Sequence, residues 1–224
     1  MAKQIFVGLT TEGTTDIRFL ESVVRRTFED VAFECTQDVE VYLYVIPSLK
    51  TGKPFPQYVK ETYSKALDMY GVMCLAVHTD ADRESYEERM ADKIEPARKE
   101  LMTLNDDESS KLLTPIIPVR MMEAWMLADK NLLKAEIGTD LSDVVLGIER
   151  NPEVIPDPKK TIEDAIRIAT EELPRRRNRP TISELYEVIG NAISTEALMT
   201  LSSYRKFKEE VRDTFGKLGY RLLV

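Results

Sequence analysis

Apolar and polar positions follow two different rhythms along the first two-thirds of the chain. Short apolar runs rich in β-branched and aromatic residues are typical of strands, and they cover residues 4–10, 39–46, 72–78 and 115–119. Between them, apolar residues recur every three or four positions, which predicts helices at residues 14–28, 57–70, 86–101 and 123–136. This alternation predicts an α/β fold with a mostly parallel, Rossmann-like sheet flanked by helices.

Two of the apolar runs also indicate where their strands lie in the sheet. Residues 72–78 are apolar without alternation, as expected of a central strand that is buried on both faces. Pro118 lies in the run at residues 115–119, and proline favours an edge strand because it has no N–H to donate. Pro96 lies within the helix predicted at residues 86–101 and is expected to kink or split it.

The last third of the chain has a different pattern. A proline-rich connection at residues 151–160 precedes three helix-like segments, near residues 161–172, 181–198 and 203–217. Thr181 and Glu184 have the spacing of a capping box at the start of the middle segment. We therefore expect an α/β domain at residues 1–140 and a helical extension at residues 141–224 that packs on it or contacts a partner.

The amino-acid composition limits the kinds of metal site that the chain can form. The chain has 224 residues, a formal net charge of −8, 2 Cys and 1 His. These Cys and His residues are too few for a four-ligand zinc site, so a bound metal needs mostly carboxylate ligands, which suit Mg²⁺, Mn²⁺ or Ca²⁺. No apolar run is long enough for a membrane helix and the first residues do not resemble a signal peptide, so we expect a cytoplasmic location.

Acidic residues directly follow two of the predicted strands. Glu12 and Asp16 belong to the segment EGTTD after the first strand, where a parallel sheet binds its ligands. Asp16 is equally well explained as the start of a helix, but no helix cap needs a glutamate at position 12. Asp80 and Asp82 follow the third strand, and as alternate residues of an extended segment their carboxylates are expected to converge. The alternative is a solvated turn in which Asp82 caps the next helix.

Taken together, these acids predict a metal site. Glu12, Asp80 and Asp82 would face one edge of the sheet and hold one or two Mg²⁺ or Mn²⁺ ions, which activate water for phosphoryl transfer. His78 either orients a water there or ends a buried strand with a structural hydrogen bond. Arg83 and Arg120 lie near the same edge, where each is either a phosphate contact or a surface ion-pair residue.

Roughly residues 4–136 resemble the Toprim domain, because one strand is followed by EGTTD and another by Asp-x-Asp. That domain occurs in primases, topoisomerases and the nucleases of the overcoming-lysogenization-defect group. With RMMEAWMLAD at residues 120–129 and the later NPE and DPK, most of the chain resembles the Toprim-like bacterial family called domain of unknown function 4276. Such proteins resemble the Toprim partners of ATPases in anti-phage defence.

The resemblance implies a role for several individual residues. Glu12, Asp80 and Asp82 would be the catalytic metal ligands, with Asp16 and Glu123 in support. Lys159 and Lys160 are candidates for the additional lysine of some Toprim nucleases, although a solvated linker is the simpler interpretation. Trp125, the single tryptophan, is expected in the core, and Asp129 is expected to pair with an arginine or cap a turn.

An arginine cluster is the last candidate for ligand binding. Its members, in an otherwise acidic chain, are Arg175, Arg176, Arg177 and Arg179. The cluster is either a phosphate contact for nucleic acid, an exposed basic loop or a contact for an acidic partner.

The sequence leads to three functional hypotheses. The first is a nuclease dependent on Mg²⁺ or Mn²⁺ that hydrolyses DNA or RNA, with an ATPase partner or a second copy of the chain as possible associates. The second is a non-catalytic Toprim-like subunit that binds or regulates. The third is a metal-dependent phosphatase or nucleotidyl-transfer enzyme that acts on small molecules.

Overall fold

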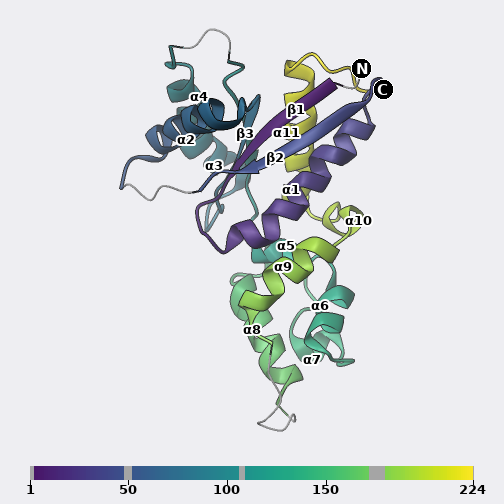
Figure 1. Ribbon diagram of the computed structural model, residues 1–224. Coiled ribbons are helices and arrows are strands. Elements are labelled where there is room, and N and C mark those ends of the chain that lie inside the picture. Colours follow the sequence, from purple (N-terminus) through teal and green to yellow (C-terminus); the bar gives the residue numbers. More distant parts are fainter. Residues whose placement is uncertain (1–2, 48–51, 106–108, 172–179, 224) are drawn as a thin grey trace.

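A computed structural model describes residues 3–47, 52–105, 109–171 and 180–223 of the chain (Figure 1). Its centre is a parallel sheet of four strands in the order β2-β1-β3-β4. The strands are β1 (Lys3–Thr10), β2 (Val39–Val45), β3 (Cys74–His78) and β4 (Leu112–Ile116). The α/β fold class expected from the alternating pattern is therefore confirmed. The strand expected at residues 115–119 lies at Leu112–Ile116 instead, and it is an edge strand as expected, although Pro118 follows it.

The first helices connect the strands, and they agree with the predicted positions in all but one case. They are α1 (Asp16–Phe33), α2 (Phe55–Tyr70), α3 (Tyr86–Arg89), the π-helix η1 (Met90–Ile94) and α4 (Glu95–Leu101). The helix at residues 86–101 is divided, as expected, but the π-helix Met90–Ile94 divides it just before Pro96. Pro96 lies in the first turn of α4, where its missing N–H costs nothing.

The segments after β4 form shorter helices. They are α5 (Glu123–Met126), α6 (Lys130–Ile137), α7 (Asp143–Leu146), the 3₁₀ turn η2 (Pro152–Val154), α8 (Pro158–Ala169), α9 (Ile182–Ala192), α10 (Thr195–Leu198) and α11 (Ser202–Lys217). The helix predicted at residues 123–136 is divided: α5 ends at Met126, and Asp129 caps the start of α6 by accepting a hydrogen bond from the N–H of Leu132. The expected capping box at Thr181 and Glu184 is present.

Both faces of the sheet are buried, and each has its own hydrophobic core. Along β3, Leu75 and Val77 face the core beneath α2 and α4, whereas Cys74 and Ala76 face the larger core on the other side. This two-residue alternation is the geometry of a strand, and burial on both faces explains why the run at β3 contains no polar position. The expectation of a central strand there is confirmed, since β3 lies between β1 and β4.

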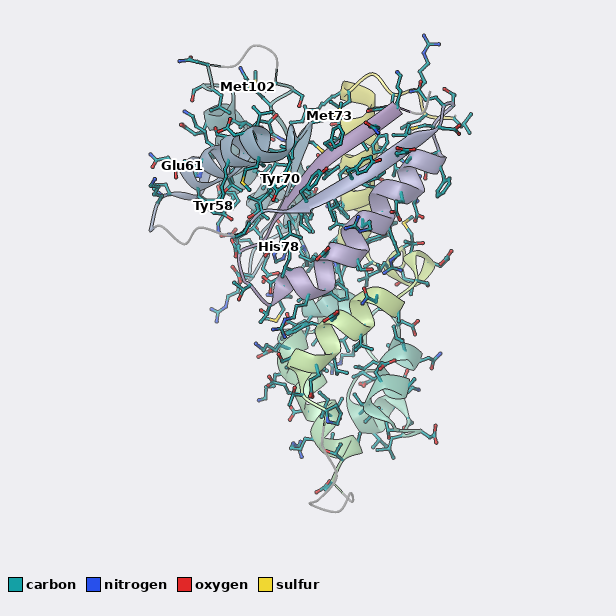
Figure 2. The ribbon with its side chains drawn as sticks, in the orientation of Figure 1. Tyr58, Glu61, Tyr70, Met73, His78 and Met102 are labelled. Carbon is teal, nitrogen blue, oxygen red and sulfur yellow. The ribbon has the colours of Figure 1, made fainter. Side chains whose placement is uncertain are left out.

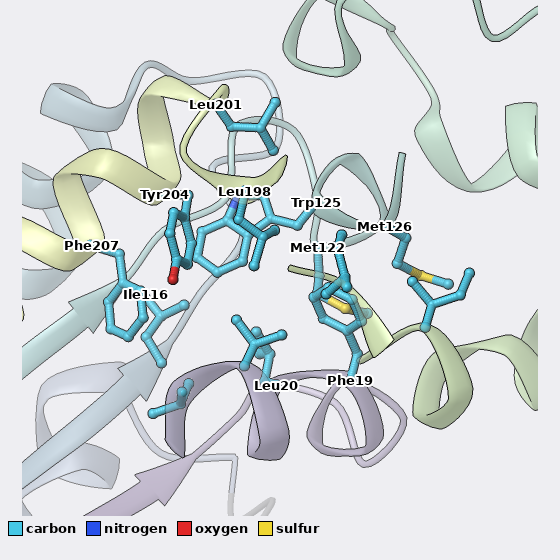
Figure 3. Close-up of a cluster of buried hydrophobic side chains, with 14 of the residues drawn as sticks. Phe19, Leu20, Ile116, Met122, Trp125, Met126, Leu198, Leu201, Tyr204 and Phe207 are labelled. Atoms are coloured by element: carbon cyan, nitrogen blue, oxygen red, sulfur yellow. The ribbon is translucent and has the colours of Figure 1, made fainter. Parts of the chain in front are cut away.

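The larger core joins the sheet to the C-terminal helices. Helix α1 packs against α9 and α11, and α11 packs on β4. Trp125 is fully buried in this core, edge-on to Tyr204 at 5.3 Å between ring centroids, and its indole N–H donates to Ser203 Oγ at 2.8 Å (Figure 3). Residues beyond position 140 therefore share a core with the sheet, and α11 packs directly on it. Among the described residues, no helix is long and apolar enough to cross a membrane.

Candidate functional site

The carboxyl ends of β1 and β3 meet at one edge of the sheet. The two strands are neighbours, with Thr10 in register with Val77, so the segments that follow them leave the sheet side by side. Figure 2 labels His78 close to this edge. Glu12, Asp16 and Asp80 come from these segments, and their side chains are brought together around His78.

His78 is the centre of the site. Its side chain is fully buried, with Nε2 3.2 Å from Asp80 Oδ1 and Nδ1 3.5 Å from Asp16 Oδ2. Nδ1 is buried without a hydrogen bond, so the carboxylate of Asp16 acts on it through charge. Burial opposes protonation of the ring, but the hydrogen bond and charge of Asp80, with the charges of Asp16 and Glu12, outweigh it and raise the pKa of His78. The imidazolium is thus stabilised by three carboxylates.

Asp16 is held by the start of α1. Its Oδ2 accepts a hydrogen bond from the N–H of Gly13 at 3.0 Å, and a Cβ at position 13 would lie only 2.8 Å from that oxygen. Glycine at position 13 therefore permits the close approach of the carboxylate. Thr15 precedes α1 without a side-chain cap bond, so the acid both begins the helix and faces His78.

Glu12 is held by two donors from distant parts of the chain. Its Oε1 accepts hydrogen bonds from Thr79 Oγ1 at 2.7 Å and from Lys93 Nζ at 3.0 Å. Burial raises the pKa of Glu12, but these two hydrogen bonds and the charges of Lys93 and His78 outweigh it, so the net pKa is lowered. Sequence reasoning did not find Lys93, because no sequence pattern marks it; in the structure it lies on the π-helix η1, and such helices often occur at functional sites.

Asp80 is fixed from the opposite side of the site. Its Oδ1 accepts the N–H of Met122 at 2.9 Å as well as contacting His78. The second oxygens, Oδ2 of Asp80 and Oε2 of Glu12, have no hydrogen-bond or ion-pair partner among the described residues. Each carboxylate is therefore oriented through one oxygen and leaves the other for a ligand.

Asp82 does not follow the expected alternation. Its backbone has a φ of 55°, so the segment is not extended at this residue and the argument that its carboxylate points with that of Asp80 is wrong. Instead, Asp82 accepts a hydrogen bond from Arg89 Nη2 at 2.9 Å, and its side chain is 67% exposed. It does not cap the next helix either, because Ser85 does so through a capping box with Glu88.

Glu123 is the buried acid of the site. It begins α5, is 7% exposed, and accepts a hydrogen bond from Tyr186 Oη on α9 at 2.6 Å. Burial raises its pKa, and the charge of Asp80 raises it further, against the opposing effects of Tyr186 and Lys159. Glu123 is therefore a buried carboxyl close enough to Asp80 to feel its charge, and it retains its proton more readily than an ordinary glutamic acid.

The arginine candidates fall into two groups. Arg83 and Arg120 line an open cleft of about 780 Å³ beside Asp82. The cluster Arg175, Arg176, Arg177 and Arg179 lies outside the described residues.

The donor set fits only one kind of metal site. No group of three His, Cys, Asp or Glu side chains is arranged to hold a metal in the described ranges, so a closed protein cage is not present there. Mg²⁺ does not need such a cage, because it usually keeps several waters and takes one or two carboxylates together with substrate phosphates. The second oxygens of Glu12 and Asp80 suit that role.

No protein-family model, curated protein or solved structure matches this chain. The resemblance to Toprim proteins therefore stays a prediction from the motifs. The residues that carry the chemistry must be argued from their geometry, and the geometry supports Glu12 and Asp80 more directly than Asp82.

Proposed function

We propose that this protein is a metal-dependent nuclease, which hydrolyses phosphodiester bonds with Mg²⁺ or Mn²⁺ bound at the carboxyl ends of β1 and β3. One observation carries the proposal: Glu12 and Asp80, after neighbouring strands, are each oriented through one oxygen, and the other oxygen has no partner in the described ranges. In parallel α/β sheets this edge is where ligands bind.

Glu12 and Asp80 are the residues that would hold the metal. When bound, the ion would lower the pKa of a water and neutralise charge on the phosphoryl oxygens. Asp82 is not assigned as a ligand, because its carboxylate is paired with Arg89. Asp16 stabilises the ring of His78 and is a positioning residue.

The remaining residues of the site keep these carboxylates in place. Thr79 and Lys93 hold Glu12, while His78 and the N–H of Met122 hold Asp80. Because each donor approaches from a rigid element or a buried position, the two carboxylates lose little freedom when a ligand binds. Lys93 also places a positive charge at the edge where a phosphate would lie.

Glu123 is the group best suited to carry a proton in this site. Its pKa is raised by burial and by Asp80, so it holds a proton at a higher pH than an ordinary glutamic acid. In phosphodiester hydrolysis the P–O bond to the leaving group breaks, and the leaving oxygen takes up a proton. We assign the supply of that proton to Glu123, directly or through a water.

Cleavage assays on plasmid DNA, single-stranded DNA and RNA with added Mg²⁺ or Mn²⁺ test the proposal. Glu12→Gln and Asp80→Asn are each expected to lower the cleavage rate by about a hundredfold or more, because metal stabilisation of the transition state contributes several kcal/mol. Glu61→Gln is the matched control, since it removes an exposed acid on α2 that pairs with Lys53. Equal rates in all three variants would contradict the assignment.

The substrate arms of the same assay separate the other hypotheses. Cleavage of a small phosphomonoester but of no nucleic acid would indicate a phosphatase, and activity only with an added ATPase would indicate a regulated effector. The ATPase partner and the role in anti-phage defence stay predictions from the resemblance.

A further inference from the structure

An open cleft near Asp80 carries a local excess of positive charge, although the protein as a whole is acidic. It lies between the turn after β3, the segment after β4 and the proline-rich connection before α8. Its lining consists of Asp82, Arg83, Glu84, Arg89, Arg120, Met121 and Pro156. Three arginines face two acids there, a local surplus of one positive charge, whereas the whole chain carries −8.

Two residues in an unusual backbone conformation form the wall of the cleft. Asp82 and Arg120 have φ angles of 55° and 67°, and the N–H of Asp82 donates to the carbonyl of Arg120 at 2.8 Å. For residues other than glycine this conformation is strained and persists only where the surroundings enforce it. The backbone hydrogen bond between them provides that constraint and fixes Arg83 and Arg120 at the same opening.

The three arginines are not equivalent. Arg89 is 7% exposed and is neutralised by Asp82 at 2.9 Å and by Glu84 at 3.3 Å. Its Nε is buried and makes no hydrogen bond. Arg83 and Arg120 form no ion pair with any described residue, although Arg120 reaches the carbonyl of Asp82 at 3.5 Å. The cleft therefore contains two uncommitted guanidinium groups around a buried third one.

We propose that this cleft binds a phosphate group through Arg83 and Arg120, with Arg89 as the buried cation beneath them. Guanidinium groups bind phosphate through paired N–H donors, which suits two arginines at one opening. Asp82 belongs to the same turn as Asp80, so a phosphate here lies beside the carboxylates. The nucleic-acid source of that phosphate rests on the proposed function, and a free nucleotide is the other source with the same chemistry.

Binding measured without divalent metal tests this cleft separately from catalysis. The probes are a fluorescein-labelled single-stranded oligonucleotide, ATP and inorganic phosphate, each titrated in EDTA at several salt concentrations. In the double variant Arg83→Gln with Arg120→Gln, affinity for the probe that wild type binds is expected to fall at least tenfold. For the oligonucleotide, the slope of log K against log salt should shrink by about 1.4, since each phosphate contact contributes about 0.7 on single strands.

A matched control separates a local effect from the loss of two charges. Arg150→Gln with Arg167→Gln removes two exposed arginines elsewhere, and its affinity and salt slope should stay at wild-type values. Thermal unfolding of both double variants confirms that they fold.

Each outcome of the binding assay decides one point. Oligonucleotide binding lost only in the cleft variant supports a nucleic-acid phosphate, and ATP or phosphate binding lost in the same way supports a free phosphate. No binding of any probe by wild type, or equal binding by the two double variants, overturns the proposal. Because no cleavage is measured, these results stand whether or not Glu12 and Asp80 prove catalytic.

Discussion

Glu153 connects the proline-rich segment to the longest C-terminal helix. Its carboxylate accepts hydrogen bonds from the N–H of Ser202 at 3.0 Å, the Oγ of Ser202 at 2.7 Å and the N–H of Ser203 at 2.8 Å. These groups form the first turn of α11, whose N-terminal N–H groups have no partners within the helix. A negative charge at this position also interacts favourably with the helix dipole.

Glu153→Gln should therefore destabilise the protein by a measurable amount. The amide keeps one acceptor oxygen but places an NH₂ group against a donor, so at least one charge-assisted hydrogen bond is lost. Such a bond contributes about 1.5–3 kcal/mol, and we expect a loss of about 2–3 kcal/mol in the free energy of unfolding. For a chain of this size that lowers Tm by about 5–10 °C.

Urea unfolding followed by tryptophan fluorescence is the assay. Trp125 is the single tryptophan, and its indole donates to Ser203 at the same helix start, so the signal comes from the affected region. Glu196→Gln is the control, because it removes an exposed acid from the first turn of α10 whose side chain makes no hydrogen bond to a described residue. Its effect should stay within about 0.5 kcal/mol.

The pH dependence gives a second test of the same contact. Burial raises the pKa of Glu153, but the hydrogen bonds from Ser203 and Ser202 outweigh it and lower the pKa below its ordinary value of 4.5. The stabilisation is therefore present above pH 4.5 and is lost as the pH falls through the lower folded-state pKa. Equal urea midpoints for the two glutamine variants, or a difference that persists unchanged at low pH, would refute the reasoning.

Two further predictions concern helix packing and the site. Gly190→Ala should destabilise the protein by about 1–3 kcal/mol in urea unfolding, because its Cβ would lie 2.7 Å from the carbonyl oxygen of Phe19, whereas Gly216→Ala, with open space, should stabilise it slightly. Asp80→Asn should lower the pKa of His78, read without metal from the NMR signals of the only histidine. The stabilising charge of His78 is present below pH 6.5 and is lost as the pH rises through the raised pKa, so the wild type should lose more stability than the variant across that range.

The strands were predictable because their burial dictates their composition. The run at residues 72–78 matches β3 closely, since both faces of that strand are covered. The strand predicted at residues 115–119 lies instead at Leu112–Ile116, because the pattern could not show that Pro115 pairs within an edge strand, in register with Val77. The helix at residues 86–101 was expected to break at Pro96, but its apolar spacing did not show that a π-helix at Met90–Ile94 would divide it.

The site was predictable only as far as it depends on strand ends. Glu12 and Asp80 were visible because parallel strands bring the residues after them to one edge. The direction of the Asp82 side chain was not predictable, because it depends on the positive φ angle of this one residue. Lys93 and Tyr186 were missed because they reach the site from helices remote in sequence, and no local pattern marks such long-range contacts.

The packing of α11 on β4 and α1 has a consequence for the order of folding. The side of β4 that α11 covers stays exposed until this helix is synthesised, and the contacts that cover it join residues about a hundred positions apart, such as Thr114 and Thr214. Contacts of that separation are slow to form, and apolar strands exposed meanwhile favour aggregation. A growing chain therefore exposes this apolar surface until α11 packs on β4 and α1.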